Sequence, residues 1–328
     1  MHMKTKDKLI KLLEENRGKY LSGAEIADQL GCTRGAVWKA INSLREDGCA
    51  ISAVTNKGYC LETDSDVLSE DGVRKYLGDE LNDIPLQVYK VTDSTNTRLR
   101  ELANNGAEEK TVVIAGAQTA GKGRLGRSFF SPSDTGLYIS ILLRPVMSAN
   151  EALKITTAAA VAVAEAIEAL SDKKPEIKWV NDVYINGRKI CGILTEAAFS
   201  MENGGLEYAV SGIGINVYQP EGGFPDEIKD IAGAVFDRRE GDLRNRLAAE
   251  LIKRFMKYYH ELDEHTYMEG YRKRLMWRNE KINIISPKET IPATMIDVDN
   301  ECRLIARFKD STEHIISTGE ISIRKAQN

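Results

Sequence analysis

The sequence predicts an α+β protein built from an N-terminal helical unit, a central mixed α/β unit and a C-terminal group of strands. Three observations indicate this division. Three amphipathic helical patterns and a hairpin pattern fill residues 1–62, an alanine-rich helix at 152–170 lies among apolar strands, and short alternating strands fill 276–328. At 328 residues, with 42% hydrophobic and 29% charged side chains, the chain is long enough for two or three domains.

The N-terminal unit has the pattern of a winged helix-turn-helix, expected over residues 1–65. Its helices are predicted at Lys4–Asn16, from the Ser22 cap to Gly31, and at Arg34–Asp47. Two strands then flank Thr55-Asn56-Lys57-Gly58, where Asn and Gly provide the chemistry of a tight hairpin turn. Together these elements place the recognition helix at residues 33–47.

The third helix carries polar and aromatic side chains on the face away from its apolar residues, and these suit contacts with phosphates and base edges. The candidate DNA-binding residues are Arg34, Trp38, Lys39, Asn42 and Arg45, with Lys57 at the hairpin tip. Because the unit is only weakly basic, useful affinity for DNA would require a dimer. A helical module used only for dimerisation, or without any function, is the alternative.

A glycine- and cation-rich segment at residues 117–132 follows an apolar strand pattern and ends in Ser-Pro. Glycine lets backbone N–H groups approach a ligand closely, and cations hold an anion. The segment contains Gly121, Lys122, Gly123, Arg124, Gly126 and Arg127. We expect a loop that closes over a phosphate-bearing ligand; a surface turn without a ligand is the alternative.

Two familiar phosphate motifs match this segment only in part. Gly116–Lys122 fits G-x-x-x-x-G-K, but Gly123 stands where a P-loop needs a Ser or Thr hydroxyl. The spacing also fits G-x-G-x-x-G, but the following Arg127–Pro132 indicates an extended chain rather than the helix of a dinucleotide fold. Neither motif is assigned.

Three further places in the centre carry polar groups among apolar residues. Asp93-Ser94-Thr95-Asn96 is interpreted as the N-cap of a helix at 97–104, although these side chains could also bind a small polar ligand. Asp182 and Lys189 flank a predicted Asn186-Gly187 turn between two strands, so they are expected to pair, with a surface ion pair as the alternative. Asn216 could bind a base edge or be a satisfied buried amide.

Charge and composition exclude several classes of function. The net charge of −4 gives no sign of a strongly basic nucleic-acid protein, and the longest apolar run, Ala158–Ala164, is too short to cross a membrane. The polar N-terminus lacks the pattern of a signal peptide. The five cysteines are scattered and the four histidines do not cluster, so we expect a reducing cytoplasm and no metal site.

The central motifs, in this order and after a winged helix, resemble the biotin–protein ligases in their bifunctional ligase/repressor form. The matching segments are Asp93–Asn96, Gln118–Arg127, Lys178-Trp179-Val180-Asn181-Asp182, Lys189–Leu194 and Gly212-Ile213-Gly214-Ile215-Asn216. The resemblance implies a ligase domain of the biotin/lipoate type at residues 66–275 and an SH3-like β-barrel at 276–328. It also implies two steps: biotin and ATP form biotinyl-5′-AMP, and a lysine of a biotin carboxyl carrier protein then takes the biotinyl group.

The resemblance also implies roles for individual residues. Biotin would be bound by Ser94, Thr95, Asn96, Gln118, Gly121, Lys122, Gly123, Arg124, Lys189 and Gly192. ATP and the adenylate would be bound by Arg124, Arg127, Phe129, Lys189 and Asn216, with Lys189, Arg124 and Lys122 as the catalytic cations. Mg²⁺ would be held mainly by the ATP phosphates.

The pattern departs from the family at two positions. Lys122 replaces a common Arg, which keeps the charge but loses the planar fork, and Val180 replaces a common Pro. Operator DNA and a homodimer are the expected partners of the repressor function. The alternatives are a ligase whose winged helix does not bind DNA, a non-catalytic biotin-sensing repressor, and a related lipoate or octanoate ligase.

Overall fold

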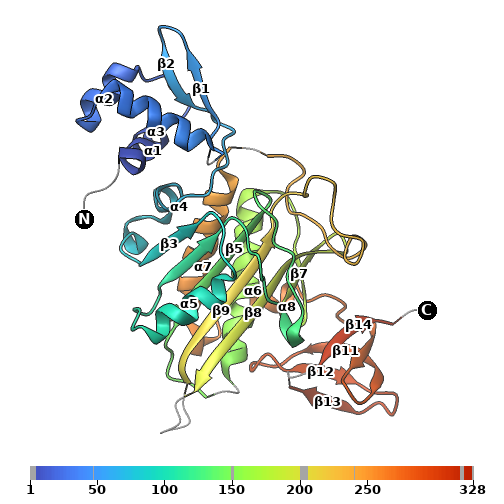
Figure 1. Ribbon diagram of the computed structural model, residues 1–328. Helices are drawn as coiled ribbons and strands as arrows, with labels where there is room; N and C mark the ends of the chain where they lie inside the picture. Colours follow the sequence, from blue (N-terminus) through green and yellow to red (C-terminus); the bar gives the residue numbers. More distant parts are fainter. Residues whose placement is uncertain are drawn as a thin grey trace. The chain divides into compact units, whose positions relative to one another are not determined.

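The computed structural model describes residues 5–46, 48–148, 151–199, 206–239, 241–317 and 321–326. The chain forms two compact units (Figure 1), and each is described separately. Unit 1 comprises residues 1–82 and 238–249, and unit 2 comprises 83–237 and 250–328. No described helix is both long and apolar enough to cross a bilayer.

Unit 1 begins with the predicted winged helix-turn-helix. Its elements are α1 (Thr5–Glu15), α2 (Gly23–Leu30), α3 (Arg34–Glu46), β1 (Ile51–Val54) and β2 (Gly58–Leu61). Ser22 forms a capping box with Glu25, and Gly31 ends α2 in the left-handed conformation, so both predicted caps of this helix are confirmed. Asp47, the expected last residue of the third helix, lies outside the described residues.

The hairpin of the wing depends on a glycine. Gly58 has φ +103°, and a Cβ there would lie 2.0 Å from the Leu21 carbonyl oxygen. This close approach lets Tyr59 and Leu21 exchange backbone hydrogen bonds of 2.9 Å, which attach the wing to the segment before α2.

Unit 1 extends beyond residue 65, the boundary expected from the sequence. It includes α4 (Glu70–Leu77), the 3-10 turn η1 (Asp79–Leu81) and the first residues of α7 (Leu243–His260). The division into 1–65, 66–275 and 276–328 therefore remains a prediction, and the compact units follow other boundaries.

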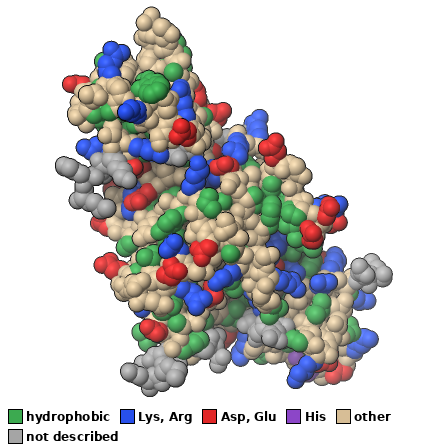
Figure 2. All heavy atoms as spheres, viewed as in Figure 1, with side chains coloured by type: hydrophobic (Ala, Val, Ile, Leu, Met, Phe, Trp, Pro, Cys, Tyr) green, Lys and Arg blue, Asp and Glu red, His purple; other side chains and the backbone are tan. Residues whose placement is uncertain are grey.

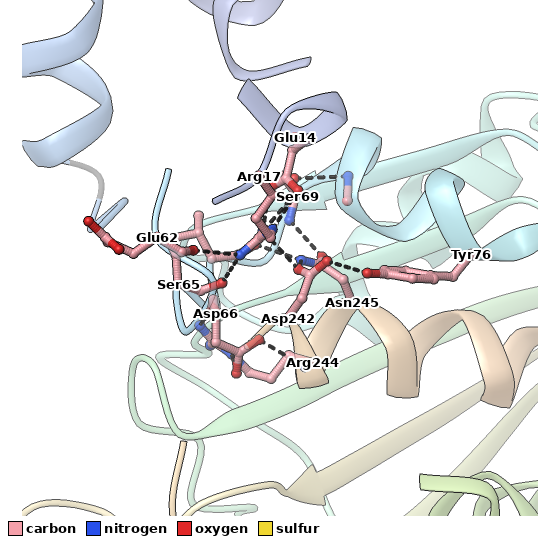
Figure 3. Close-up of polar contacts among 12 residues, drawn as sticks. Glu14, Arg17, Glu62, Ser65, Asp66, Ser69, Tyr76, Asp242, Arg244 and Asn245 are labelled. Atoms are coloured by element: carbon pink, nitrogen blue, oxygen red, sulfur yellow. Dashed lines mark hydrogen bonds and ion pairs between the residues drawn. The ribbon is translucent and has the colours of Figure 1, made fainter. Parts of the chain in front are cut away.

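A buried polar cluster joins these parts of unit 1, and Figure 3 shows its residues. Arg17 forms ion pairs with Glu14 at 2.7 Å and with Asp242 at 3.2 Å. Tyr76 donates its hydroxyl to Asp242 at 2.8 Å, and burial, followed by this hydrogen bond, raises the pKa of Tyr76 to about 12. A second buried pair, Arg244 with Asp66 at 3.2 Å, lies in the same region. These residues together form the Arg17 cluster.

Unit 2 is built on a seven-stranded mixed sheet in the order β3-β4-β5-β9-β8-β7-β6. Only β3 and β4 pair in parallel among the described strands. The strands are β3 (Leu86–Tyr89), β4 (Val112–Ala115), β5 (Gly136–Leu143), β6 (Glu176–Lys178), β7 (Asp182–Ile185), β8 (Arg188–Phe199) and β9 (Leu206–Asn216).

Helices cover both faces of this sheet (Figure 1). The alanine-rich α6 (Ala152–Leu170) has the predicted bounds and is almost wholly buried on one face. The shorter α5 (Thr95–Asn104) packs on β4, β5 and β9 from the other face. Unit 2 also contains the later residues of α7, the 3-10 turns η2 (Arg124–Gly126) and η4 (Leu262–Glu264), and the helix α8 (Met268–Lys273).

The chain before the predicted Asn186-Gly187 turn is not the single strand expected there. Residues 177–185 form two antiparallel strands, β6 and β7, in which Lys178 pairs with Asp182. Residues 179–181 make the turn between them, and Trp179 and Val180 are buried there. The apolar residues of this segment suggested a continuous strand because the turn has no Gly or Pro to mark it.

The C-terminal residues form a five-stranded antiparallel sheet in the order β13-β12-β11-β10-β14. Its strands are β10 (Lys281–Ile285), β11 (Thr290–Val298), β12 (Leu304–Arg307), β13 (Glu313–Ile316) and β14 (Ser322–Lys325). The β-rich character of this part is confirmed. The pairing is compatible with an SH3-like barrel, whose closure remains a prediction.

Candidate active site

Unit 2 contains a cavity of about 500 Å³ at the end of the glycine-rich loop. This volume lies within the usual range for small-molecule sites. Neutral polar side chains line one part of it: Ser94, Thr95, Asn96 and Gln118. Cationic side chains line another part: Lys122, Arg124, Arg127, Lys178, Lys189 and Arg324. Asp182 is the one carboxylate among the described lining residues, so the cavity is suited to an anion.

The neutral polar groups are connected to one another at the start of α5. The Thr95 amide donates to Gln118 Oε1 at 2.8 Å, and Gln118 Nε2 donates to Ser131 Oγ at 3.0 Å. The Ser140 hydroxyl, fully buried on β5, lies 2.7 Å from Thr95 Oγ1. These bonds hold Thr95 and Gln118 in fixed positions beside the cavity.

This arrangement corrects the interpretation of residues 93–96 as a helix cap. Ser94 occupies the N-cap position of α5, but its side chain makes no capping hydrogen bond. Thr95 and Asn96 belong to the helix, and their side chains bond to groups of the sheet and the loop instead. The second option, polar side chains beside a ligand cavity, agrees with these positions.

Two paired glycines form the floor of the cavity. Gly192 on β8 and Gly214 on β9 are cross-strand partners, and the Phe129 ring lies directly on them. A Cβ on Gly214 would be 2.6 Å from a Phe129 ring carbon. A side chain is therefore excluded at Gly214 as long as Phe129 keeps this place, and a Cβ on Gly192 would be tight against the ring at 3.1 Å.

The glycine-rich loop folds back on itself. Phe129 donates its amide to the Gly121 carbonyl at 2.9 Å, and Gly123 donates to the Arg127 carbonyl at 2.7 Å. A Cβ on Gly121 would be 2.5 Å from the Phe129 oxygen, so this close return requires glycine. The fold-back brings Lys122, Arg124 and Arg127 to one cavity.

Arg124 reaches from the loop to the turn between β6 and β7. Its Nη1 donates to Asn181 Oδ1 at 3.0 Å. Asn181 is fixed in turn, because its Nδ2 donates to the Ile193 carbonyl at 2.9 Å. Burial lowers the pKa of Arg124, against the opposing effect of Asp182. An anion in the cavity would stabilise this charge, which has lost part of its hydration.

The predicted pair of Lys189 and Asp182 is confirmed, with Nζ and Oδ1 2.6 Å apart. Nearby, the Lys178 ammonium lies 5.9 Å from the Tyr184 ring and 5.6 Å from the Trp277 ring. Burial lowers the pKa of Lys178 below its usual 10.5; Asp182 opposes this effect and Lys189 adds to it. Burial thus outweighs the attraction of Asp182, and an anion bound beside Lys178 would stabilise its ammonium form.

Most of the candidate residues meet at this cavity, and two do not line it. Gly121 lies within the loop and packs against the Phe129 carbonyl oxygen. Asn216 donates Nδ2 to the Gly233 carbonyl at 3.0 Å, which agrees with the alternative of a self-satisfied amide. Sequence reasoning did not single out Lys178 or Arg324, which also line the cavity. A cation inside an apolar strand pattern was the available signal for Lys178.

The candidate DNA-binding residues lie in unit 1 as the helical pattern predicted. Val37, Ala40, Ile41 and Leu44 of α3 are buried, whereas Trp38 is 57% exposed. Figure 2 shows exposed hydrophobic atoms beside Lys and Arg side chains on this unit. Exposed side chains also belong to Arg34, Lys39, Arg45 and Lys57, and Asn42 is half-buried. Arg45 Nε donates to the Ile51 carbonyl at 2.9 Å, so this residue also ties α3 to the wing.

Comparison with protein families gives two matches. The biotin/lipoate A/B protein ligase family matches residues 88–216, the part of the chain that runs from within β3 to the end of β9. A helix-turn-helix domain family matches residues 5–60.

Individual proteins resemble nearly the whole chain. The bifunctional ligase/repressor BirA of Bacillus subtilis is 38% identical over 278 residues, which are 84% of this chain and 84% of that protein. The protein of the same name from Escherichia coli is 29% identical and covers 98% of this chain and 97% of its own length. Among solved structures, Aquifex aeolicus biotin protein ligase in complex with biotin and ATP has a TM-score of 0.63 and 27% identity. That match covers 74% of this chain and 99% of the other.

Proposed function

The chain belongs to the family of bifunctional ligase/repressors, and from this membership we propose that it is an ATP-dependent biotin–protein ligase that also represses the biotin operon. The ligase would form biotinyl-5′-AMP and transfer biotin to a lysine of a biotin carboxyl carrier protein. A cytoplasmic location is part of the proposal, because scattered cysteines suit a reducing compartment.

One observation carries the ligase proposal: neutral hydrogen-bonding groups and a cationic group of residues line the same cavity. Ser94, Thr95, Asn96 and Gln118 would bind the ring system of biotin. Lys122, Arg124 and Lys189 would hold the biotin carboxylate and the α-phosphate, with Gly123 and Gly192 giving the space for close approach and Gly121 allowing the loop to fold back. A lipoyl or octanoyl chain would offer these four polar side chains no hydrogen-bond partner.

In the first step, a carboxylate oxygen of biotin attacks the α-phosphorus of ATP. The new C(O)O–P bond forms as the bond to the bridging oxygen breaks, and pyrophosphate leaves. Lys122, Arg124 and Lys189 would stabilise the negative charge that develops on the phosphoryl oxygens. Arg127 and Phe129 would bind the adenylate part, with Phe129 as an apolar surface for the base. Asn216 would offer the base only its Oδ1, because its Nδ2 is bonded to the Gly233 carbonyl. Mg²⁺ would be held mainly by the ATP phosphates.

In the second step, the neutral amine of the carrier lysine attacks the acyl carbon of the adenylate. An amide forms, AMP leaves with the C–O electron pair, and the amine loses a proton. The protein provides position and exclusion of water, since no covalent enzyme intermediate is needed. The fold-back of the loop around Gly121 and Phe129 would serve this exclusion.

Transfer of radiolabelled biotin to a carrier domain tests the ligase proposal. We expect ATP-dependent label on the carrier lysine and biotin-dependent exchange of pyrophosphate into ATP. Pyrophosphate exchange without transfer would indicate that another acceptor is used. Absence of both reactions would contradict the ligase and leave the non-catalytic biotin sensor.

The repressor proposal rests on the exposed face of α3 and the wing of unit 1. Arg34, Trp38, Lys39, Asn42, Arg45 and Lys57 would contact operator DNA, with the α3 side chains in the major groove. A homodimer formed with bound biotinyl-adenylate would bring two such units to a palindromic operator.

A gel shift with a palindromic operator fragment tests this part separately. We expect tighter binding with biotin and ATP than without them, and a matching shift to dimer in sedimentation. Equal binding in all conditions would contradict the biotin-responsive repressor. No binding in any condition would favour a ligase whose winged helix does not bind DNA.

A further inference from the structure

Glu196 on β8 lies just beyond the cavity, on the face of the sheet that Leu194 shares. Its carboxylate is not among the lining residues, but Oε2 accepts a hydrogen bond of 2.8 Å from Asn96 Nδ2. Its other oxygen lies 3.4 Å from Arg100 Nη1. Glu196 therefore contacts the cavity only through Asn96, whose side chain is almost fully buried.

The hydrogen bonds of Asn96 can be counted completely. Nδ2 carries two hydrogens, and they go to Glu196 Oε2 and to the Leu194 carbonyl at 3.3 Å. Oδ1 accepts from the Ser140 hydroxyl at 2.6 Å. Both N–H groups of Asn96 are thus used within the protein. A ligand could bond only to the second lone pair of Oδ1, which accepts a hydrogen bond.

The orientation of this amide is decided by the charge of Glu196. An ionised carboxylate only accepts hydrogen bonds, so it selects the Nδ2 side of Asn96. If the amide turned over, Oδ1 would face the carboxylate oxygen at the distance that Nδ2 now has. The Leu194 carbonyl also selects Nδ2, but through a longer and uncharged contact.

Gly212 on β9 fixes the position of the Asn96 amide. A Cβ on that residue would lie 2.0 Å from Asn96 Oδ1, so the amide rests directly on the β9 backbone. Backbone contact thus sets where the amide lies, and Glu196 sets which way it faces.

We propose that Glu196 is a positioning residue that makes Asn96 present only an acceptor, so that the cavity selects a ligand with an N–H at this point. This inference rests on the proposed function, in which the cyclic urea of biotin supplies that N–H. A ring oxygen in the same place would meet the Asn96 oxygen and be rejected.

The test uses the full-length enzyme, biotin, and the two cyclic carbamate analogues in which one or the other urea N–H is replaced by oxygen. Wild-type protein is expected to discriminate strongly between the two carbamates. In Glu196→Gln the amide partner can donate or accept, so only the longer contact with the Leu194 carbonyl still favours the present orientation of Asn96. We expect the KM for biotin to rise about tenfold, as for loss of one charge-assisted hydrogen bond, with kcat and the KM for ATP unchanged.

The decisive measurement is the ratio of kcat/KM for the two carbamates, which should fall towards one in Glu196→Gln. Glu101→Gln is the matched control: this carboxylate belongs to α5 itself, is 55% exposed and pairs with Arg98 on the same helix. This control should keep the wild-type ratio and KM.

A wild-type ratio and KM in Glu196→Gln would overturn the positioning role. A raised KM with an unchanged ratio would show a general loss of the site and would overturn it as well. Absence of adenylation by the wild-type enzyme would instead contradict the proposed function.

Discussion

At the scale of single residues, the cations of the cavity differ in how firmly they are held. Arg124 has a hydrogen bond to Asn181, and Lys189 has an ion pair with Asp182. Lys178 is flanked by two aromatic rings. Asp182 interacts with all three cations, so the effects of replacing them are not expected to be additive.

Arg124→Ala should release the adenylate faster than the wild-type enzyme does. The substitution removes a half-buried guanidinium that would bind the phosphoryl oxygens, and we expect a loss of about 1.5–3 kcal/mol in retention. The dissociation rate of labelled biotinyl-AMP measures it. Arg278→Ala is the control, because Arg278 pairs with Asp297 and does not line the cavity. Equal release by both variants would contradict the assignment.

The lowered pKa of Lys178 predicts that anion binding depends on pH. Its pKa in the free protein is lowered by burial, and a bound anion would favour the ammonium form and raise it. Binding should therefore take up a proton, and the affinity for pyrophosphate should fall as the pH rises from the lowered pKa towards 10.5. Calorimetry in two buffers of different ionisation enthalpy measures this uptake.

The matched variant for this prediction is Lys178→Met, which keeps the length of the side chain and removes the charge. It should bind pyrophosphate more weakly and lose the alkaline proton uptake. An unchanged uptake in this variant would assign the titration to another group.

At the scale of elements, local chemistry predicted the helices and hairpins well. Ser22 and Gly31 mark the ends of α2, and Asn186-Gly187 marks the turn between β7 and β8, where both residues have positive φ. The turn after β6 was missed because Trp179 and Val180 are buried by tertiary packing, which no local pattern records. Non-local contacts also decide that Asn96 faces Glu196, 100 positions further along the chain.

The buried charges of the Arg17 cluster predict that replacing Arg17 alone strongly lowers the stability of unit 1. Arg17→Met would leave Glu14 and Asp242 buried without their cation, and such losses cost about 3–5 kcal/mol. Glu70→Gln, which breaks an exposed pair with Arg74 on α4, should cost less than about 1 kcal/mol. Urea unfolding followed by circular dichroism compares the two. Similar midpoints for both variants would contradict the role of the cluster.

At the scale of the whole molecule, unit 1 is assembled from two separate stretches of chain. Asp66 and Arg244 are 178 positions apart, yet they form a buried pair. A fragment of residues 1–82 lacks Asp242, Arg244 and Asn245, so it should unfold at lower urea and less cooperatively than unit 1 in the full chain. Equal midpoints would show that the later residues add nothing to this unit.

The sequence and the resemblance predicted the order of the three parts and most of the cavity. They could not predict that residues 238–249 belong with the winged helix, because that membership depends on contacts between residues far apart in the sequence, such as Asp66 with Arg244 and Tyr76 with Asp242. The sequence also could not predict that Asn216 donates its Nδ2 to the Gly233 carbonyl, because the two residues meet only in the folded chain.

The two-stretch construction of unit 1 has a consequence for synthesis on the ribosome. Residues 5–82 emerge first, but the side chains that complete the Arg17 cluster emerge only after β3 to β9 have all been translated. A nascent chain therefore cannot complete its winged-helix unit before the strands of the ligase sheet have been made. Premature termination inside the catalytic region would yield an incomplete unit 1 rather than a finished DNA-binding module detached from its enzyme.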